Sequence, residues 1–129
     1  MTDKQVLKEF LEMPLWQSDD VFEKFRYHLK AIFREDRINP KQRFLYIEGF
    51  HREKVVLCAH ADAFFDKHYG FSENDHEIRE QDGYFTGDKK NGIGADDRAG
   101  CAMLYLLRDS GHSILITDGE EQGQTGSRG

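Results

Sequence analysis

Three short clusters of acidic and imidazole side chains are the residues of this chain whose types could do chemistry. They are His60-x-Asp62, the pair Asp96–Asp97 and the pair Glu120–Glu121. A histidine beside a carboxylate can bind a metal through one ring nitrogen while the carboxylate holds the other. Imidazole and carboxylate together suit zinc first, and cobalt or manganese after it. Without a cation, carboxylates packed this closely would repel one another, or some would stay protonated.

Each cluster has a simpler interpretation when it is taken alone. A histidine at a strand end is more often held by a local hydrogen bond. Two aspartates before a helix are usually an N-cap and an acid that complements the helix dipole, and two glutamates in a glycine-rich loop are usually solvated. Gly92 and Gly94 suggest a phosphate cradle, but the full spacing is absent and the aspartates that follow would repel phosphate. The ordered set of three is therefore more specific than any member.

The elements around these clusters predict that they meet. Lys54–His60 and Ser113–Thr117 are apolar runs typical of buried strands, and helical spacing predicts a helix over Arg98–Asp109 between them. Strand, helix and strand in this order favour a βαβ-like unit of an α/β sandwich, with Lys54–His60 in the middle of the sheet. Ligands of such sheets collect beyond the carboxyl ends of the strands, so we expect one site there.

The rest of the chain predicts a single domain over residues 1–129. The apolar spacing of residues 3–12 predicts a short helix, and a stripe that includes Ile32 and Phe33 predicts a second helix from Ser18 to about Arg34. The other expected segments are a strand over Arg43–Glu48, a long loop over Phe64–Gln81 and a short strand over Gly83–Thr86.

Composition narrows the class of protein. A net charge of −6 argues against a nucleic-acid surface, and no run reaches the ~18–20 apolar residues of a membrane helix. The N-terminus has no apolar segment of a secretory signal. Cys58 and Cys101 form neither a CxxC motif nor a disulfide framework, which favours buried free thiols in a reducing compartment. We therefore expect a cytoplasmic protein with no nucleic-acid or membrane partner.

The three motifs together resemble those of a known superfamily. HAD at residues 60–62, GADDRAG at 94–100 and DGEEQGQTGS at 118–127 are similar, in this order, to the metal-site motifs of the co-catalytic zinc aminopeptidases and carboxypeptidases. GADDRAG most resembles the glutamyl/leucyl-type, deblocking aminopeptidase branch, and EEQGQTGS equally resembles bacterial secreted leucine aminopeptidases. The resemblance covers roughly Val55–Gly129.

This resemblance implies a fold and an activity. The fold would be a three-layer α/β/α sandwich with a mixed, largely parallel central sheet, and the activity would be hydrolysis of peptide or amide bonds in small peptides by metal-activated water. Two zinc ions are expected, with cobalt or manganese as substitutes. The implied roles are His60 as a zinc ligand, Asp62 as the residue that orients it, Asp96 as the bridging ligand, Asp97 as its neighbour across a cis peptide, Glu120 as the general base and Glu121 as the ligand of the second zinc.

The chain departs from the family pattern after Glu121. The family completes its site with a further acidic residue and a histidine downstream, and the sequence up to Gly129 supplies neither. A catalytic zinc normally has three protein ligands. We therefore expect a partial peptidase-like domain, incomplete at its C-terminus, that binds zinc weakly by itself. The alternative is a non-catalytic relative that keeps the fold for binding or assembly, and a homo-oligomer is compatible with either.

Overall fold

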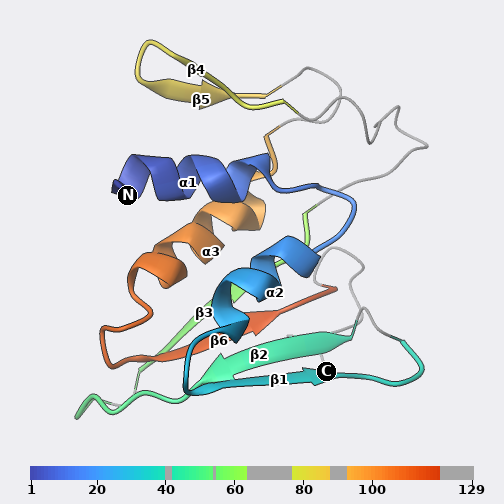
Figure 1. Cartoon of the computed structure of the whole chain (residues 1–129), viewed down its shortest axis with the longest axis vertical. Helices are drawn as coiled ribbons and strands as arrows, with labels where there is room; N and C mark the ends of the chain where they lie inside the picture. Colours follow the sequence, from blue (N-terminus) through green and yellow to red (C-terminus); the bar gives the residue numbers. More distant parts are fainter. Residues whose placement is uncertain (40–41, 54, 64–76, 88–92, 120–129) are drawn as a thin grey trace.

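A four-stranded sheet with helices packed against it forms the body of the chain, and a two-stranded sheet lies on the far side of those helices (Figure 1). The computed structural model describes residues 1–39, 42–53, 55–63, 77–87 and 93–119. In chain order the elements are α1 (Asp3–Glu12), α2 (Asp19–Arg26), β1 (Ala31–Glu35), β2 (Arg43–Ile47), β3 (Val56–His60), β4 (Arg79–Gln81), β5 (Tyr84–Thr86), α3 (Ala95–Leu106) and β6 (Ser113–Thr117). The α/β class expected from the sequence is confirmed.

The larger sheet is mixed, with the strand order β1-β2-β6-β3. The β1–β2 and β2–β6 pairs are antiparallel, and β3 pairs with β6 in parallel. The expected sheet was mixed and largely parallel. The described sheet is mixed, but β3–β6 is the one parallel pair among its three described pairs. The reason is that β1 and β2 are joined by a short connection, which forces an antiparallel pair.

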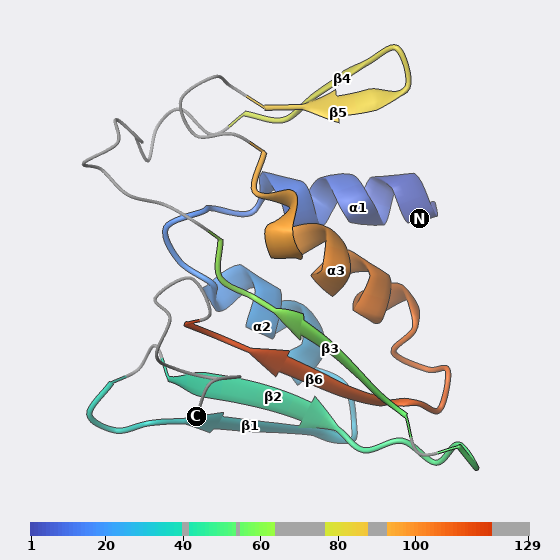
Figure 2. The ribbon, with the colours of Figure 1, turned by 180° about the vertical axis from the view of Figure 1, so that it is seen from behind.

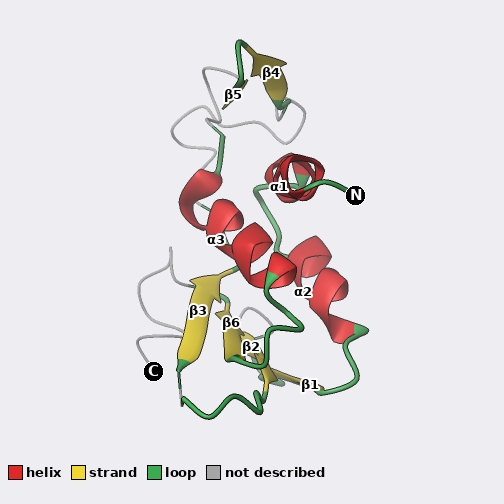
Figure 3. Cartoon of the chain, turned by 90° about the vertical axis from the view of Figure 1, so that its left-hand side faces the viewer, coloured by secondary structure: helices red, strands yellow, loops and turns green. Residues whose placement is uncertain are grey.

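The helices of the described residues lie on one face of this sheet (Figures 2 and 3). Helix α3 packs on β3 and on α1, while α2 covers the β1–β2 side. The described residues therefore form two layers, and a second helical layer of the expected α/β/α sandwich is not found among them. None of the helices in this part of the chain is long and apolar enough to cross a membrane.

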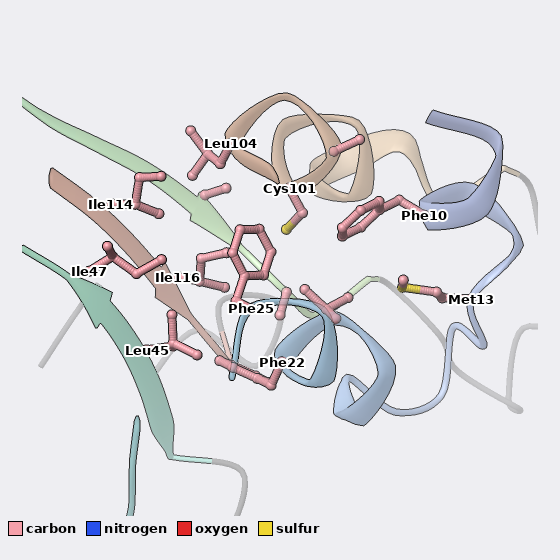
Figure 4. Packing of buried hydrophobic residues seen from close by; sticks show 14 of the residues in the cluster. Phe10, Met13, Phe22, Phe25, Leu45, Ile47, Cys101, Leu104, Ile114 and Ile116 are labelled. Atoms are coloured by element: carbon pink, nitrogen blue, oxygen red, sulfur yellow. The ribbon is translucent and has the colours of Figure 1, made fainter. Parts of the chain in front are cut away.

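The core lies between the helices and the sheet face that they cover (Figure 4). Alternate residues of the strands point to this face, and Leu45 and Ile116, which pair across β2 and β6, are both fully buried there. Three aromatic rings close the core from the helical side: the centroids of Phe10 and Phe25 are 5.6 to 5.7 Å from that of Tyr105. These contacts connect α1, α2 and α3 into one unit.

The opposite face of the sheet keeps apolar side chains exposed. Ile32 on β1, Phe44 on β2 and Val56 on β3 are 43, 40 and 49% exposed. Strand β3 lies at the edge of the described sheet, so the prediction that Lys54–His60 occupies the middle was wrong. The run is apolar throughout because apolar side chains occupy both the face of β3 that the helices cover and the opposite, exposed face. Cys58 lies on that open face, which explains why it is exposed and not buried as expected.

The second helix is shorter than the sequence predicted. It ends at Arg26; residues 27–30 form a turn, and the residues expected to continue the helix after that turn belong to β1 instead. In β1 the side chains alternate: Phe33 packs on Phe22 with ring centroids 5.4 Å apart, while Ile32 faces outward. Ile32 and Phe33 are adjacent in sequence, so they fit a helical stripe and a strand equally well. Pairing with β2 selects the strand.

A hairpin replaces the end of the long loop expected over Phe64–Gln81. Residues 64–76 of that segment lie outside the described residues, and Arg79–Gln81 pairs with Tyr84–Thr86. The expected strand over Gly83–Thr86 is confirmed as β5. Asp82 and Gly83 both have positive φ, at 52° and 82°, as a two-residue hairpin turn requires. The Asp-Gly pair was the sequence signal for this hairpin.

Candidate metal centre

The carboxyl ends of β3 and β6 lie side by side, as the βαβ interpretation predicted. His60 pairs with Thr117, and the Ala61 N–H donates to the Thr117 carbonyl at 2.7 Å, which extends the parallel ladder beyond the strand. The first acidic cluster and the segment that leads to the third therefore emerge at the same edge. Glu120 and Glu121 lie outside the described residues, so their place at this edge stays a prediction.

His60 lies between two aspartates at this edge. Its Nδ1 atom is 2.8 Å from the carbonyl oxygen of Asp62 and 3.3 Å from that residue's carboxylate, and its Nε2 atom is 3.0 Å from Oδ1 of Asp96. The side chains of His60 and Asp62 are each 15% exposed, whereas that of Asp96 is 87% exposed. The structure thus brings these three predicted site residues together, with Nε2 directed to the open side.

The two carboxylates change the acid–base behaviour of His60. Burial alone lowers the pKa of its imidazole, but hydrogen bonds to Asp62 and Asp96, together with the charge of Asp62, outweigh burial and raise the pKa to about 9. The same surroundings that stabilise an added proton also favour a bound cation. Because proton and metal compete for the same ring nitrogen, a divalent cation would take the place of the proton between Nε2 and Asp96.

The side chains of Asp96 and Asp97 contact different parts of His60. The peptide bond between them is cis, as the resemblance implied. Both residues have non-helical backbone angles inside the assigned α3, so regular helix begins at Arg98, where the sequence predicted it. Oδ2 of Asp97 accepts a hydrogen bond from the main-chain N–H of His60 at 3.3 Å. Asp97 therefore holds the end of β3 while Asp96 faces the imidazole.

Gly100 makes room for this arrangement. A Cβ atom at Gly100 would overlap the carboxylate of Asp97, so a larger residue would displace the side chain that holds His60. This contact explains the spacing of GADDRAG. Gly100 lies three residues after Asp97, about one helical turn, so its backbone faces the Asp97 carboxylate. The motif is thus a packing requirement as well as a chemical one.

Arg98 connects the site to the helical layer. It is fully buried, and its guanidinium donates to three main-chain carbonyls: that of Ala61 at 2.6 Å, that of Gln17 at 3.0 Å and that of Met13 at 3.3 Å. Burial lowers its pKa. Ala61 lies between His60 and Asp62, so Arg98 fixes the segment that carries both. This role was not predicted from the sequence, although an arginine in the first turn of an otherwise apolar helix was a signal for it.

A second buried network holds the segment that leaves β6. Asp118 is 4% exposed, and its carboxylate accepts hydrogen bonds from the Ser18 hydroxyl and from Nε of Arg43, both at 2.8 Å. Arg43 also pairs with Asp19 at 2.7 Å. These contacts tie the start of the Asp118–Ser127 motif to α2 and β2. The sequence analysis included Asp118 in a motif but assigned it no role.

The described residues supply part of a metal-binding set. Nε2 of His60 and the carboxylate of Asp96 are the donors that face each other, and Asp62 holds the opposite ring nitrogen, as expected for a neutral imidazole ligand. Nitrogen and oxygen donors of this kind fit zinc. Within the described ranges no group of three ligands is assembled, and Glu121 is the predicted ligand that lies outside them.

Comparisons with known proteins bear on the fold. No protein-family model matches the chain, and no curated protein does. Among solved structures, the aminopeptidase PepT from Bacillus cereus ATCC 10987 is similar, with 19% identity and a TM-score of 0.67 over 95% of this chain and 38% of its own. The aminoacylhistidine dipeptidase from Vibrio alginolyticus matches with 20% identity and a TM-score of 0.55, over 97% of this chain and 29% of its own. The chain therefore shares its fold with parts of two solved peptidases.

Proposed function

We propose that these residues form part of a zinc-dependent, aminopeptidase-type hydrolase of peptide or amide bonds. The observation that carries the proposal is the position of His60 between Asp62 and Asp96 at the carboxyl end of a parallel strand pair. The fold shared with two peptidases supports it. The chain spans 38% and 29% of the lengths of those proteins, so the whole activity is proposed for a site to which these residues contribute.

Each residue has one task in this proposal. Nε2 of His60 and the Asp96 carboxylate would hold the cation, Asp62 would fix the orientation of the imidazole, and Glu121 would add a further oxygen ligand. When bound, zinc supplies a Lewis acid that polarises the substrate carbonyl and activates water. Glu120 would accept the proton from that water and pass it to the leaving amine. The excess of carboxylates favours a substrate with a free amino terminus.

Metal binding tests the proposal first. The chain is dialysed to equilibrium against a series of zinc concentrations, which detects weak binding, and analysed for bound metal in parallel with His60→Ala and with His28→Ala as the matched control. His28 is also partly buried and also pairs with an aspartate, but it lies beyond the opposite end of β6. We expect bound zinc that is lost in His60→Ala and kept in His28→Ala. Equal zinc in all three proteins would refute the site.

Turnover separates an enzyme from a binding module. The zinc-loaded protein is assayed for release of p-nitroaniline from leucine p-nitroanilide, and Glu120→Gln is compared with the unchanged chain. Loss of a measurable rate in Glu120→Gln, with zinc still bound, would support a hydrolase. A measurable rate in the unchanged chain would exclude the alternative, a non-catalytic peptidase-like module, and an equal rate in Glu120→Gln would contradict the role proposed for Glu120.

A further inference from the structure

A pocket of about 600 Å³ opens at the end of the sheet opposite the candidate metal centre. It is lined by residues from segments 24–30, 47–50 and 105–112, where α2 passes to β1, where β2 ends and where α3 passes to β6. The first residue of β6 lies at this end and its last residue pairs with His60 at the other. The pocket is therefore separate from the site already described, and its size is that of a small-molecule site.

Exposed apolar side chains line this pocket. Tyr27 is 83% exposed, Leu29 is 101% exposed and Phe50 is 73% exposed. Single exposed apolar residues need no explanation, but three large ones around one concavity are typical of a surface that contacts a ligand. These three side chains form an apolar wall of the pocket and are not part of the hydrophobic core.

Two opposite charges stand beside this wall. The register of β1 and β2 pairs Ala31 with Ile47, so Lys30 and Glu48 are the next neighbours across the end of the ladder. Both line the pocket, yet none of the ion pairs in the described part of the chain joins them. Nζ of Lys30 lies over the ring of Phe50, 4.8 Å from its centroid. A cation and an anion are thus both presented beside an apolar surface.

The pocket also contains a polar atom that the fold leaves unsatisfied. Nδ1 of His112 is buried and has no hydrogen-bond partner among the described residues. Its ring packs against that of His51, with centroids 4.4 Å apart. A buried polar atom without a partner costs about 1–3 kcal/mol, and a ligand that donates or accepts a hydrogen bond there would remove this cost. His112 is one of the residues that line the pocket, so its ring lies beside any ligand bound there.

We propose that this pocket binds a small zwitterion with an apolar side group, namely an α-amino acid or a short peptide. Its carboxylate would pair with Lys30, its ammonium group with Glu48, and its side group would pack on Tyr27, Leu29 and Phe50. A simple anion would leave Glu48 without a partner, and a simple cation would leave Lys30 without one. The zwitterion satisfies both charges and the apolar wall at once.

Three probes that share one ring test the proposal. L-phenylalanine carries both charges, 3-phenylpropionate lacks the ammonium group and phenethylamine lacks the carboxylate. Each is titrated into the metal-free chain and followed by backbone amide NMR. We expect saturable shifts at Phe50 and His112 with L-phenylalanine, with a Kd of about 1 mM or below, and binding about tenfold weaker for each truncated probe.

Variants identify the contacts. Lys30→Ala should weaken L-phenylalanine and 3-phenylpropionate and leave phenethylamine unchanged, and Glu48→Ala should weaken L-phenylalanine and phenethylamine instead. Arg37→Ala, which removes an exposed cation beyond the other end of β1, is the matched control and should change none of them.

Three results would overturn the proposal. They are the absence of saturable binding, equal affinities for the three probes, and loss of L-phenylalanine binding in His60→Ala. The last would place the amino acid at the candidate metal centre, so this test and that of the proposed function fail independently.

Discussion

Replacement of Arg98 by methionine should release the segment that carries His60 and Asp62. Methionine keeps an apolar stem of similar length but has no donor. Three main-chain carbonyls then lose their partner inside the protein: one between the two site residues, and two, those of Met13 and Gln17, in the connection from α1 to α2.

The expected loss of stability follows from these contacts. A buried acceptor left without a donor costs about 1–3 kcal/mol, so the buried carbonyls of Ala61 and Met13 together cost about 2–6 kcal/mol, and the partly buried carbonyl of Gln17 adds less. The variant no longer has to bury a guanidinium, which offsets part of this cost, and breaking a buried charged contact typically destabilises by about 3–5 kcal/mol. We take about 3–5 kcal/mol as the expected decrease in the free energy of unfolding. Stability per residue in native proteins is about 0.05–0.15 kcal/mol, so the decrease is a large share of the total.

Trp16 provides the assay. It is the single tryptophan of the chain and lies between Met13 and Gln17, the two residues of the α1–α2 connection that Arg98 holds. Urea unfolding followed by tryptophan fluorescence and by far-ultraviolet circular dichroism should give a lower midpoint by both signals. The native fluorescence spectrum should also shift, because Trp16 loses the fixed position of its neighbours.

Two further variants complete the experiment. Arg79→Met removes an exposed arginine with a surface ion pair and should change stability by less than about 1 kcal/mol. Arg98→Lys keeps the charge with fewer donors in a different geometry, and its stability should lie between those of Arg98→Met and the unchanged chain. Arg98→Met with the stability of Arg79→Met and an unchanged tryptophan spectrum would refute the reasoning.

Three other outcomes are expected. Asp118→Asn should lower the free energy of unfolding by about 3 kcal/mol, measured by urea titration, since it removes the buried carboxylate that pairs with the largely buried Arg43. Gly100→Ala should destabilise the chain in the same assay, although alanine favours helices by about 1 kcal/mol, because the new methyl group displaces Asp97. With Ellman's reagent, exposed Cys58 should react in the native protein, whereas Cys101, whose pKa burial raises to about 12, should react only after unfolding.

Matched controls make these outcomes informative. Asp19→Asn removes the other carboxylate that pairs with Arg43, one whose side chain is 66% exposed, and should cost less than about 1 kcal/mol. Equal losses for Asp19→Asn and Asp118→Asn would contradict the burial argument. A Gly100→Ala protein more stable than the unchanged chain would show that Asp97 moves without cost. Two thiols reacting at one rate in the native state would contradict the burial of Cys101.

The meeting of His60, Asp62 and Asp96 followed from the sequence because it depends on topology alone. A strand, a helix and a parallel strand place the first strand's carboxyl end beside the helix start, whatever the details of packing. The role of Arg98 did not follow, because the carbonyls that it binds come from segments 37 and more residues away in sequence. A local sequence pattern cannot predict hydrogen bonds to residues that far away in the chain.

The position of each strand in the sheet also could not be predicted from the sequence pattern. Whether β3 lies inside the sheet or at its edge is decided by which strands pair, and an apolar run is compatible with both. The end of α2 depended in the same way on the pairing of β1 with β2. In both cases a long-range contact decided the outcome: it set the position of β3 in the sheet, and it selected strand over helix for β1.

The position of β6 in the sheet affects how the sheet can form during synthesis of the chain. Strands β1, β2 and β3 all precede β6 in the chain, yet β6 lies between β2 and β3 and joins them into one sheet. Until Ser113–Thr117 leaves the ribosome, the nascent chain holds a hairpin and a lone strand whose inner edges lack their partner. Unpaired strand edges promote association between chains. The interval before this strand is made is therefore one in which the growing polypeptide exposes two strand edges to association with other chains.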